Sequence, residues 1–221
     1  MVKKISTDDN FNFLLVALLF LLFSIAAVKQ FADGAGQQLV LAATVVTLFI
    51  SVWSIRQQKA WFRTGVGIIA LFLIITAVGA LFNQSGLDVV YLLVILIFFV
   101  LTAHTAAKQV LFSGEITVNK IVGSICIFLL LGLIWAVLYL ILLEFDPATL
   151  NNVPVASWYD NFSRVIYFSF VTLTTLGYGE ITPALPVAQF LAFIEAIMGL
   201  FYIAVMVASL VGVGIASRTK N

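Results

Sequence analysis

Long apolar runs separated by short polar stretches dominate the pattern of this chain. The runs cover about residues 11–28, 39–54, 65–82, 89–107, 121–143 and 187–217. Most of them approach the ~20 apolar residues that a helix needs to cross the hydrocarbon core of a bilayer. The last run would form a helix about 45 Å long. Because this length exceeds the ~30 Å core, we expect that helix to tilt and to protrude into the cytoplasm. The pattern predicts six transmembrane helices.

The composition agrees with a membrane setting. Hydrophobic residues make up 63% of the chain and charged residues 10%, whereas soluble domains are about a quarter charged. We therefore expect an all-α integral membrane protein. The net charge of +1 gives no reason to expect a nucleic-acid partner. The single cysteine, Cys126, lies within an apolar run and is expected to face the core or the lipid.

The first run follows Lys3 and Lys4, so a secretory signal peptide is an alternative to a transmembrane helix. Ala26 and Ala27 would suit a cleavage site, but the run is longer than the apolar core of a typical signal. A retained helix is the preferred interpretation.

The basic residues predict the orientation of the six helices. If the helices alternate in direction, nearly all basic residues fall on one side, and the other side holds only Lys29 and Arg164. Basic loops stay in the cytoplasm, so both termini are expected there and residues 144–186 are expected outside. The basic residues of the predicted cytoplasmic side are Lys3, Lys4, Arg56, Lys59, Arg63, Lys108, Lys120, Arg218 and Lys220.

A shorter segment lies between the last two runs. Asp160 and Asn161 can cap a helix over residues 162–174, which is too short to cross a bilayer. We expect this helix to re-enter the membrane from outside and to direct its partly negative C-terminal end at a central cavity. The alternative is a tight extracellular loop with a Gly-Tyr-Gly turn.

The residues that follow this short helix carry the most specific chemistry. Residues 174–180 read Thr-Thr-Leu-Gly-Tyr-Gly-Glu. Carbonyls of successive residues can face one way if alternate residues take left-handed backbone angles, which Gly177 and Gly179 adopt without steric cost. Such a row of carbonyls replaces the water shell of a cation. The Thr175 hydroxyl would add the innermost ligand, and the Tyr178 ring should turn away from the pore and act as a packing strut.

Residues 121–217 resemble the pore domain of the potassium channel family, in its prokaryotic branch with one pore loop per chain. The resemblance is carried by residues 172–183, then by Glu195, Gly199, Tyr202 and residues 210–212. It implies a homotetramer in the cell membrane, with a four-fold pore. The implied K⁺ sites are formed by the carbonyls of Thr175, Leu176, Gly177 and Tyr178, and the filter comprises these four residues and Gly179.

Two residues depart from the common pattern of that family. The acidic residue after the filter is commonly Asp, and here it is Glu180, which we expect at the outer mouth. Four positions before Thr175, where some channels carry a carboxylate that pairs with this acid, the chain has Val171. Neither change alters the ion ligands, but the inactivation of those relatives is not expected here.

The last run carries the candidates for gating. Leu200, Ile203, Val207 and Val211 recur at helical spacing and match the pore-lining face of the family, although packing against the fifth run is an alternative. Gly199 stands 24 positions after Thr175, where the family has a hinge glycine. Glycine also permits close packing of helices in membranes.

Two titratable residues within the apolar runs need separate interpretations. An acid inside a transmembrane run has a function or a buried partner. For Glu195 we favour a structural role, with a hydrogen bond from Ser169 or Thr172 of the short helix. For His104, the only histidine, we favour an interhelical hydrogen bond over a pH sensor.

The chain is predicted to divide into a four-helix region over residues 1–107, a cytoplasmic linker over 108–120 and a pore domain over 121–217. The fourth run, residues 89–107, contains no Lys or Arg. A voltage sensor needs several arginines along one helix, so gating by that route is not expected. The first four helices are instead expected to pack around the pore or to bind lipid.

The leading hypothesis is a homotetrameric potassium channel that has membrane lipid around it and needs no cofactor. A less selective cation channel and a non-conducting partner subunit of another channel remain alternatives. An enzyme is not expected, because the runs contain no paired carboxylates, metal-ligand cluster or nucleophile–base set.

Overall fold

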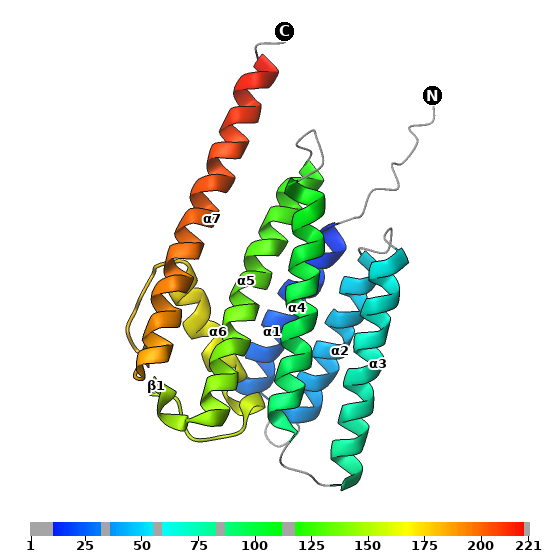
Figure 1. The fold of residues 1–221 in the computed structure, drawn as a ribbon, viewed down its shortest axis with the longest axis vertical. Coiled ribbons are helices and arrows are strands. Elements are labelled where there is room, and N and C mark those ends of the chain that lie inside the picture. Colours follow the sequence, from blue (N-terminus) through cyan, green and yellow to red (C-terminus); the bar gives the residue numbers. More distant parts are fainter. Residues whose placement is uncertain (1–10, 32–35, 55–58, 83–86, 112–117, 219–221) are drawn as a thin grey trace.

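The computed structural model describes residues 11–31, 36–54, 59–82, 87–111 and 118–218. Long helices run roughly side by side, and the start of α1 and the end of α7 lie at the same end of the molecule (Figure 1). In chain order the helices are α1 (Phe11–Phe31), α2 (Gly36–Ser54), α3 (Lys59–Phe82), α4 (Asp88–Leu111), α5 (Val118–Phe145), the 3₁₀ helix η1 (Pro147–Thr149), α6 (Trp158–Leu173) and α7 (Pro186–Arg218). Strands β1 (Leu150–Asn151) and β2 (Thr182–Pro183) pair antiparallel.

Each of the six predicted apolar runs forms a helix, and the short segment forms α6. Over the described residues, four helices are long and apolar enough to cross a membrane: α1, α4, α5 and α7. The described apolar stretches of α2 and α3, Ala42–Ser54 and Phe62–Ile75, are shorter than a span. The structure is therefore that of a helical membrane protein with four candidate spans.

The predicted start of the short helix is wrong. The helix α6 begins at Trp158 after Ser157, and Asp160 lies in its first turn. The Ser157 hydroxyl donates to Asp160 Oδ2 over 2.6 Å. Asn161 is buried, and its amide donates to the carbonyl of Pro154 over 2.9 Å. Asp160 and Asn161 therefore do not cap a helix that begins at residue 162. They fix the loop before α6 and the first turn of the helix.

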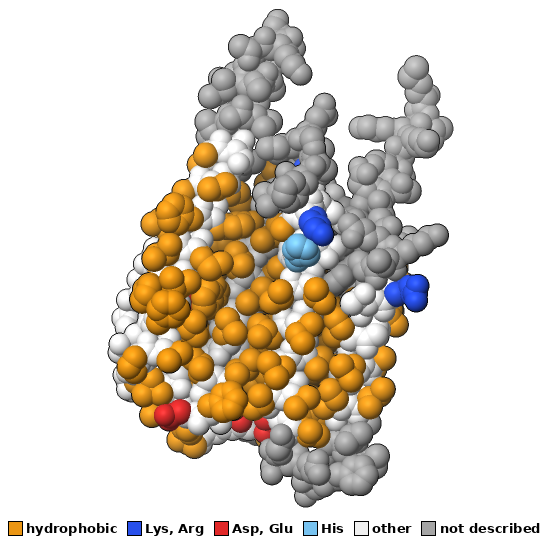
Figure 2. Space-filling model, in the orientation of Figure 1, with side chains coloured by type: hydrophobic (Ala, Val, Ile, Leu, Met, Phe, Trp, Pro, Cys, Tyr) orange, Lys and Arg blue, Asp and Glu red, His pale blue; other side chains and the backbone are white. Residues whose placement is uncertain are grey.

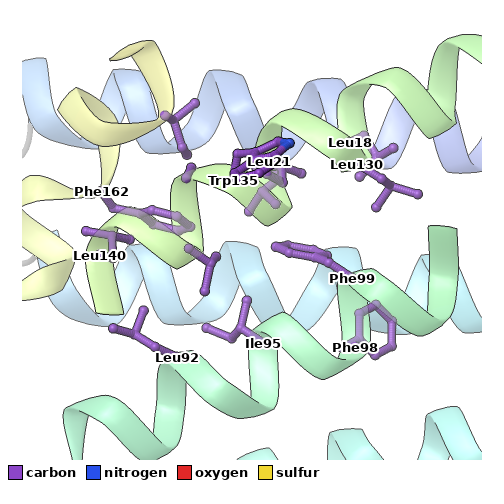
Figure 3. Packing of buried hydrophobic residues seen from close by; sticks show 14 of the residues in the cluster. Leu18, Leu21, Leu92, Ile95, Phe98, Phe99, Leu130, Trp135, Leu140 and Phe162 are labelled. Atoms are coloured by element: carbon purple, nitrogen blue, oxygen red, sulfur yellow. The ribbon is translucent and has the colours of Figure 1, made fainter. Parts of the chain in front are cut away.

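The apolar core has α5 at its centre. Figure 3 shows side chains of α1, α4, α5 and α6 meeting there, among them Leu18, Phe99, Leu130 and Phe162. All four are fully or almost fully buried. The core is therefore continuous between the first four helices and the outer helix of the predicted pore domain.

Polar contacts join the first helices to α5 near its start and to α6 at the opposite end of the bundle. The Phe11 amide donates to Asn119 Oδ1 over 3.1 Å, and Cys126 Sγ lies 3.6 Å from the Phe11 carbonyl oxygen. Cys126 is buried, as expected of a core-facing residue. At the other end the indole of Trp158 donates to Asp88 Oδ1 over 3.0 Å. The start of α6 is thereby joined to the start of α4.

The helix α7 packs very differently from α5. Only 11% of its described span is buried in the chain, against 56% of the span of α5. Large apolar side chains of α7, such as Leu200 and Phe201, are exposed in the chain. Figure 2 shows apolar side chains over the left side of the molecule, where α7 lies. This face is covered by something other than the chain itself, either lipid or another protein surface.

We expect the Leu130→Ala substitution to destabilise the protein by about 2–3 kcal/mol, because it leaves a cavity between closely packed helices. The lower part of the known range applies, since lipid does not drive apolar side chains together as water does. Thermal unfolding in detergent measures the effect. Leu93→Ala is the matched control, because Leu93 is 43% exposed whereas Leu130 is fully buried. Equal losses for both variants would contradict the packing described above.

Candidate ion-conduction site

The site is built on the C-terminal end of α6. One face of this helix packs into the core through Phe162, Val165 and Phe168. The opposite face carries Arg164 and Tyr167, which are exposed. The helix ends at Leu173, immediately before the predicted filter. Its last carbonyls have no partner within the helix and are free to accept hydrogen bonds from the residues that follow.

The filter backbone alternates as the sequence predicted. Gly177 and Gly179 have φ angles of 59° and 89°, in the left-handed region that glycine adopts freely. Thr175 also lies there, with φ of 58°, which the sequence did not predict. A β-branched residue is strained in this conformation. The three left-handed residues occupy every second position, which is the condition for successive carbonyls to face one way.

Hydrogen bonds fix the direction of two of these carbonyls. The amides of Leu176 and Gly177 both donate to the carbonyl oxygen of Val171, over 2.9 and 3.2 Å. In a trans peptide the carbonyl points opposite to the N–H of the next residue. The carbonyls of Thr175 and Leu176 therefore both point away from α6. Two of the four predicted K⁺-ligand carbonyls face the same side.

The filter is exposed in the isolated chain. The side chains of Leu176 and Tyr178 are 54% and 65% exposed. The described residues of this chain leave most of the Tyr178 side chain uncovered, so its expected role as a packing strut stays a prediction.

The outer end of the filter is held by contacts that the sequence did not reveal. The Tyr167 hydroxyl donates to Glu180 Oε1, and the Asn152 amide donates to the Glu180 carbonyl over 2.8 Å. Asn151 donates to the Thr182 hydroxyl over 3.0 Å beside the β1–β2 pairing. Tyr167 lies one helical turn before Val171 and contacts Glu180, the acid that Val171 cannot contact. In the sequence, only the four-residue spacing between Tyr167 and Val171 could have indicated the contact with Glu180.

The hydrogen bond to Glu180 raises the pKa of Tyr167 to about 12. A raised pKa means that the phenol keeps its proton at neutral pH and loses it only in strong alkali. Tyr167 is therefore a donor to Glu180 throughout the physiological range.

Glu195 lies behind the filter rather than in a cavity. It is completely buried, and Ser169 Oγ lies 2.6 Å from its Oε1, as the sequence predicted. The other proposed partner, Thr172, donates instead to the Phe168 carbonyl of its own helix. Tyr139 of α5, which the sequence analysis missed, donates to Glu195 Oε2 over 2.8 Å. Glu195 therefore joins α7 to both α5 and α6.

Gly199 marks the closest approach between α7 and α6. A Cβ atom at this position would lie 1.8 Å from the carbonyl oxygen of Leu173. That oxygen belongs to the backbone at the end of α6 and cannot move without moving the filter. The structure thus gives a packing reason for a glycine at this position, and its predicted role as a hinge stays a prediction.

The gate candidates lie on the exposed part of α7. Leu200, Ile203 and Val207 are 61%, 42% and 50% exposed in the chain. Their spacing places them along one stripe of the helix. The side chain of Val211 lies outside the described residues. These side chains are therefore free to line a shared cavity.

His104 does not lie between helices as the sequence analysis expected. It is exposed on α4 (Figure 2), and the neighbouring Thr102 and Thr105 donate to the Phe98 and Leu101 carbonyls of their own helix. The two threonines thus satisfy their hydroxyls within α4, and the His104 side chain points away from the other described helices.

The architecture is that of a helical membrane protein in which a short helix leads into an extended segment of alternating backbone handedness. Residues 126–215 match the family model described as ion channel. The matched range contains most of α5, all of α6, the filter and most of α7, and it excludes α1 to α4. A search among curated proteins gives no match. The match supports ion channel activity for the part of the molecule that contains the site.

We expect the Gly199→Ala substitution to destabilise the protein by about 3 kcal/mol or more, the upper end of the cost of overpacking. The reason is that the new methyl group meets a backbone oxygen and not a movable side chain. Thermal unfolding of the purified protein measures this. Gly67→Ala is the control, because a Cβ at Gly67 of α3 meets nothing within 4 Å. A Gly199→Ala variant as stable as Gly67→Ala would contradict the close approach.

Proposed function

We propose that this protein is a potassium channel that conducts K⁺ passively through a filter of backbone carbonyls. The observation that carries the proposal is the hydrogen bonding of two successive filter amides to Val171, which directs the carbonyls of Thr175 and Leu176 to one side. The left-handed angles of Gly177 and Gly179 continue the same alternation. Carbonyl oxygens of this kind replace the water shell of K⁺ as it enters.

The functional unit is a homotetramer. One filter segment presents a single row of oxygens and encloses no ion, so four copies around one axis are needed. The exposed filter and the exposed face of α7 support this assembly, because both would be covered by neighbouring copies. In the tetramer Leu200, Ile203 and Val207 line the cavity below the filter, and four copies of Glu180 at the outer mouth attract cations.

All six long helices cross the membrane, and both termini are cytoplasmic. The start of α1 and the end of α7 lie at one end of the molecule (Figure 1). On the face drawn in Figure 2, basic side chains lie toward that end and acidic side chains toward the opposite end. This distribution supports the orientation, because basic residues stay on the cytoplasmic side. The cell membrane of a prokaryote is the proposed location.

Flux of potassium or rubidium into liposomes that hold the purified tetramer tests this function. We expect flux that barium blocks and that strongly favours K⁺ over Na⁺. The Gly177→Ala variant should lose K⁺ flux about tenfold or more, because an L-residue with left-handed angles costs about 1–2 kcal/mol in each of four chains. A Cβ there meets nothing within 4 Å in the single chain, so the substitution adds backbone strain without a clash inside the chain.

Gly67→Ala serves as the control for the flux experiment, because Gly67 lies on α3, outside the proposed pore. Equal flux of Na⁺ and K⁺ would show a less selective cation channel. A verified tetramer without flux, even after its gate has been opened by substitution, would favour a non-conducting partner subunit.

We expect Ile203→Asp and Val207→Asp to raise the conductance or the open probability. An apolar constriction closes a pore by excluding water, and a carboxylate would wet it. Single-channel recording in bilayers measures both quantities. Val205→Asp is the control. Val205 is two residues away from both Ile203 and Val207, so it lies on the opposite side of α7. There it lines a groove with Ile127 and Leu131 of α5. Unchanged currents in both test variants would show that Ile203 and Val207 do not line the pore.

A further inference from the structure

A buried cluster of hydroxyl and carboxyl groups joins three helices behind the filter. It consists of Glu195 of α7, Tyr139 of α5 and Ser169 of α6, none of which has any exposed surface. Tyr139 donates to Glu195 Oε2 over 2.8 Å. Ser169 Oγ lies 2.6 Å from Glu195 Oε1 and 2.7 Å from the carbonyl oxygen of Gly132. Three short contacts thus connect four oxygen-bearing groups in a chain.

Each of the three oxygen–oxygen contacts needs one hydrogen atom to be a hydrogen bond. Ser169 has one hydroxyl hydrogen, but it lies between two oxygens, and the Gly132 carbonyl can only accept. An ionised carboxylate also accepts only. With Glu195 ionised, Tyr139 and Ser169 supply two hydrogens for three contacts, and one contact would bring two acceptors together. With Glu195 protonated, three hydrogens serve three contacts.

We propose that Glu195 is a neutral carboxylic acid whose proton completes a chain of hydrogen bonds between the helices around the filter. In this chain Tyr139 donates to Glu195 Oε2, Glu195 Oε1 donates to Ser169, and Ser169 donates to Gly132. Glu195 acts as a positioning residue for conduction, and this role rests on the proposed channel function. The protonation itself does not depend on that function.

The chain of hydrogen bonds acts on the filter through α6. Ser169 lies two residues before Val171, whose carbonyl oxygen holds the amides of Leu176 and Gly177. Gly199, one turn after Glu195 on α7, lies against the carbonyl of Leu173. A shift of α6 relative to α5 and α7 would therefore move the acceptor that sets the direction of the filter carbonyls.

The neutral state makes the side chain replaceable by glutamine. The carbonyl oxygen of Gln accepts from Tyr139 and its amide donates to Ser169, so the whole chain of hydrogen bonds is retained. Leucine at the same position can neither accept nor donate. Ser169→Ala removes the central hydroxyl with a smaller change of volume, so it serves as the second variant if Glu195→Leu does not fold.

Infrared spectroscopy of the purified protein at neutral pH tests the protonation. The expected result is a carbonyl-stretch band of a protonated carboxylic acid that shifts in heavy water and is missing from Glu195→Gln. Glu180→Gln, which removes an exposed carboxylate, is the spectroscopic control and should leave the band in place. Absence of the band in the unaltered protein, or its persistence in Glu195→Gln, would overturn the proposal.

Flux into liposomes tests the positioning role. Glu195→Gln should conduct at the unaltered rate with unaltered preference for K⁺ over Na⁺. Ser169→Ala and Glu195→Leu should lose K⁺ flux or selectivity about tenfold, the factor that one lost buried hydrogen bond implies. Unaltered flux in these two variants would overturn the positioning role. If a verified tetramer does not conduct even after its gate has been opened by substitution, the channel proposal fails, whereas the infrared band still shows whether Glu195 is protonated.

Discussion

One carbonyl oxygen, that of Val171, accepts hydrogen bonds from two successive amides of the filter, and the geometry of the site follows from this contact. A segment whose carbonyls must face an ion cannot satisfy its amides in a sheet or a helix. The end of a helix, in turn, leaves several carbonyls without partners. Here Phe170, Val171 and Thr172 accept from the amides of residues 174–177. The unpaired acceptors of α6 and the unpaired donors of the filter satisfy each other.

The position of α6 consequently determines the position of the filter, and several different interactions fix α6. A Cβ at Gly132 would lie 2.6 Å from the Phe170 ring, so that glycine lets α5 approach. Gly199 does the same for α7 at Leu173. Ser169 and Glu195 add polar links from the interior. At the outer end Tyr167 and Asn152 hold Glu180. The helix is held along its whole length by neighbours from distant parts of the sequence.

The sequence predicted the parts of this arrangement that depend on local properties. Apolar runs defined the helices, and the glycines at 177 and 179 predicted the alternating backbone. The Ser169–Glu195 contact was predictable because an acid inside a transmembrane run needs a polar partner and the family resemblance placed Glu195 behind the short helix. Tyr139 and Asn152 were not predictable, because their partners lie 56 and 28 residues away and depend on how the helices pack. The left-handed angle of Thr175 opposes its local preference and is imposed by the hydrogen bonds around it.

The first four helices also contact the helices that hold the site. The core formed with α5 is continuous through α1 and α4, and Trp158, the first residue of α6, donates to Asp88 at the start of α4. Since α4 carries no basic residue between positions 89 and 107, the membrane field has little charge to act on there. The observed contacts of α1 and α4 are packing and hydrogen bonds with α5 and α6. Of the four candidate spans, α7 has the smallest buried share over its described residues, so it is the span that this chain itself covers least.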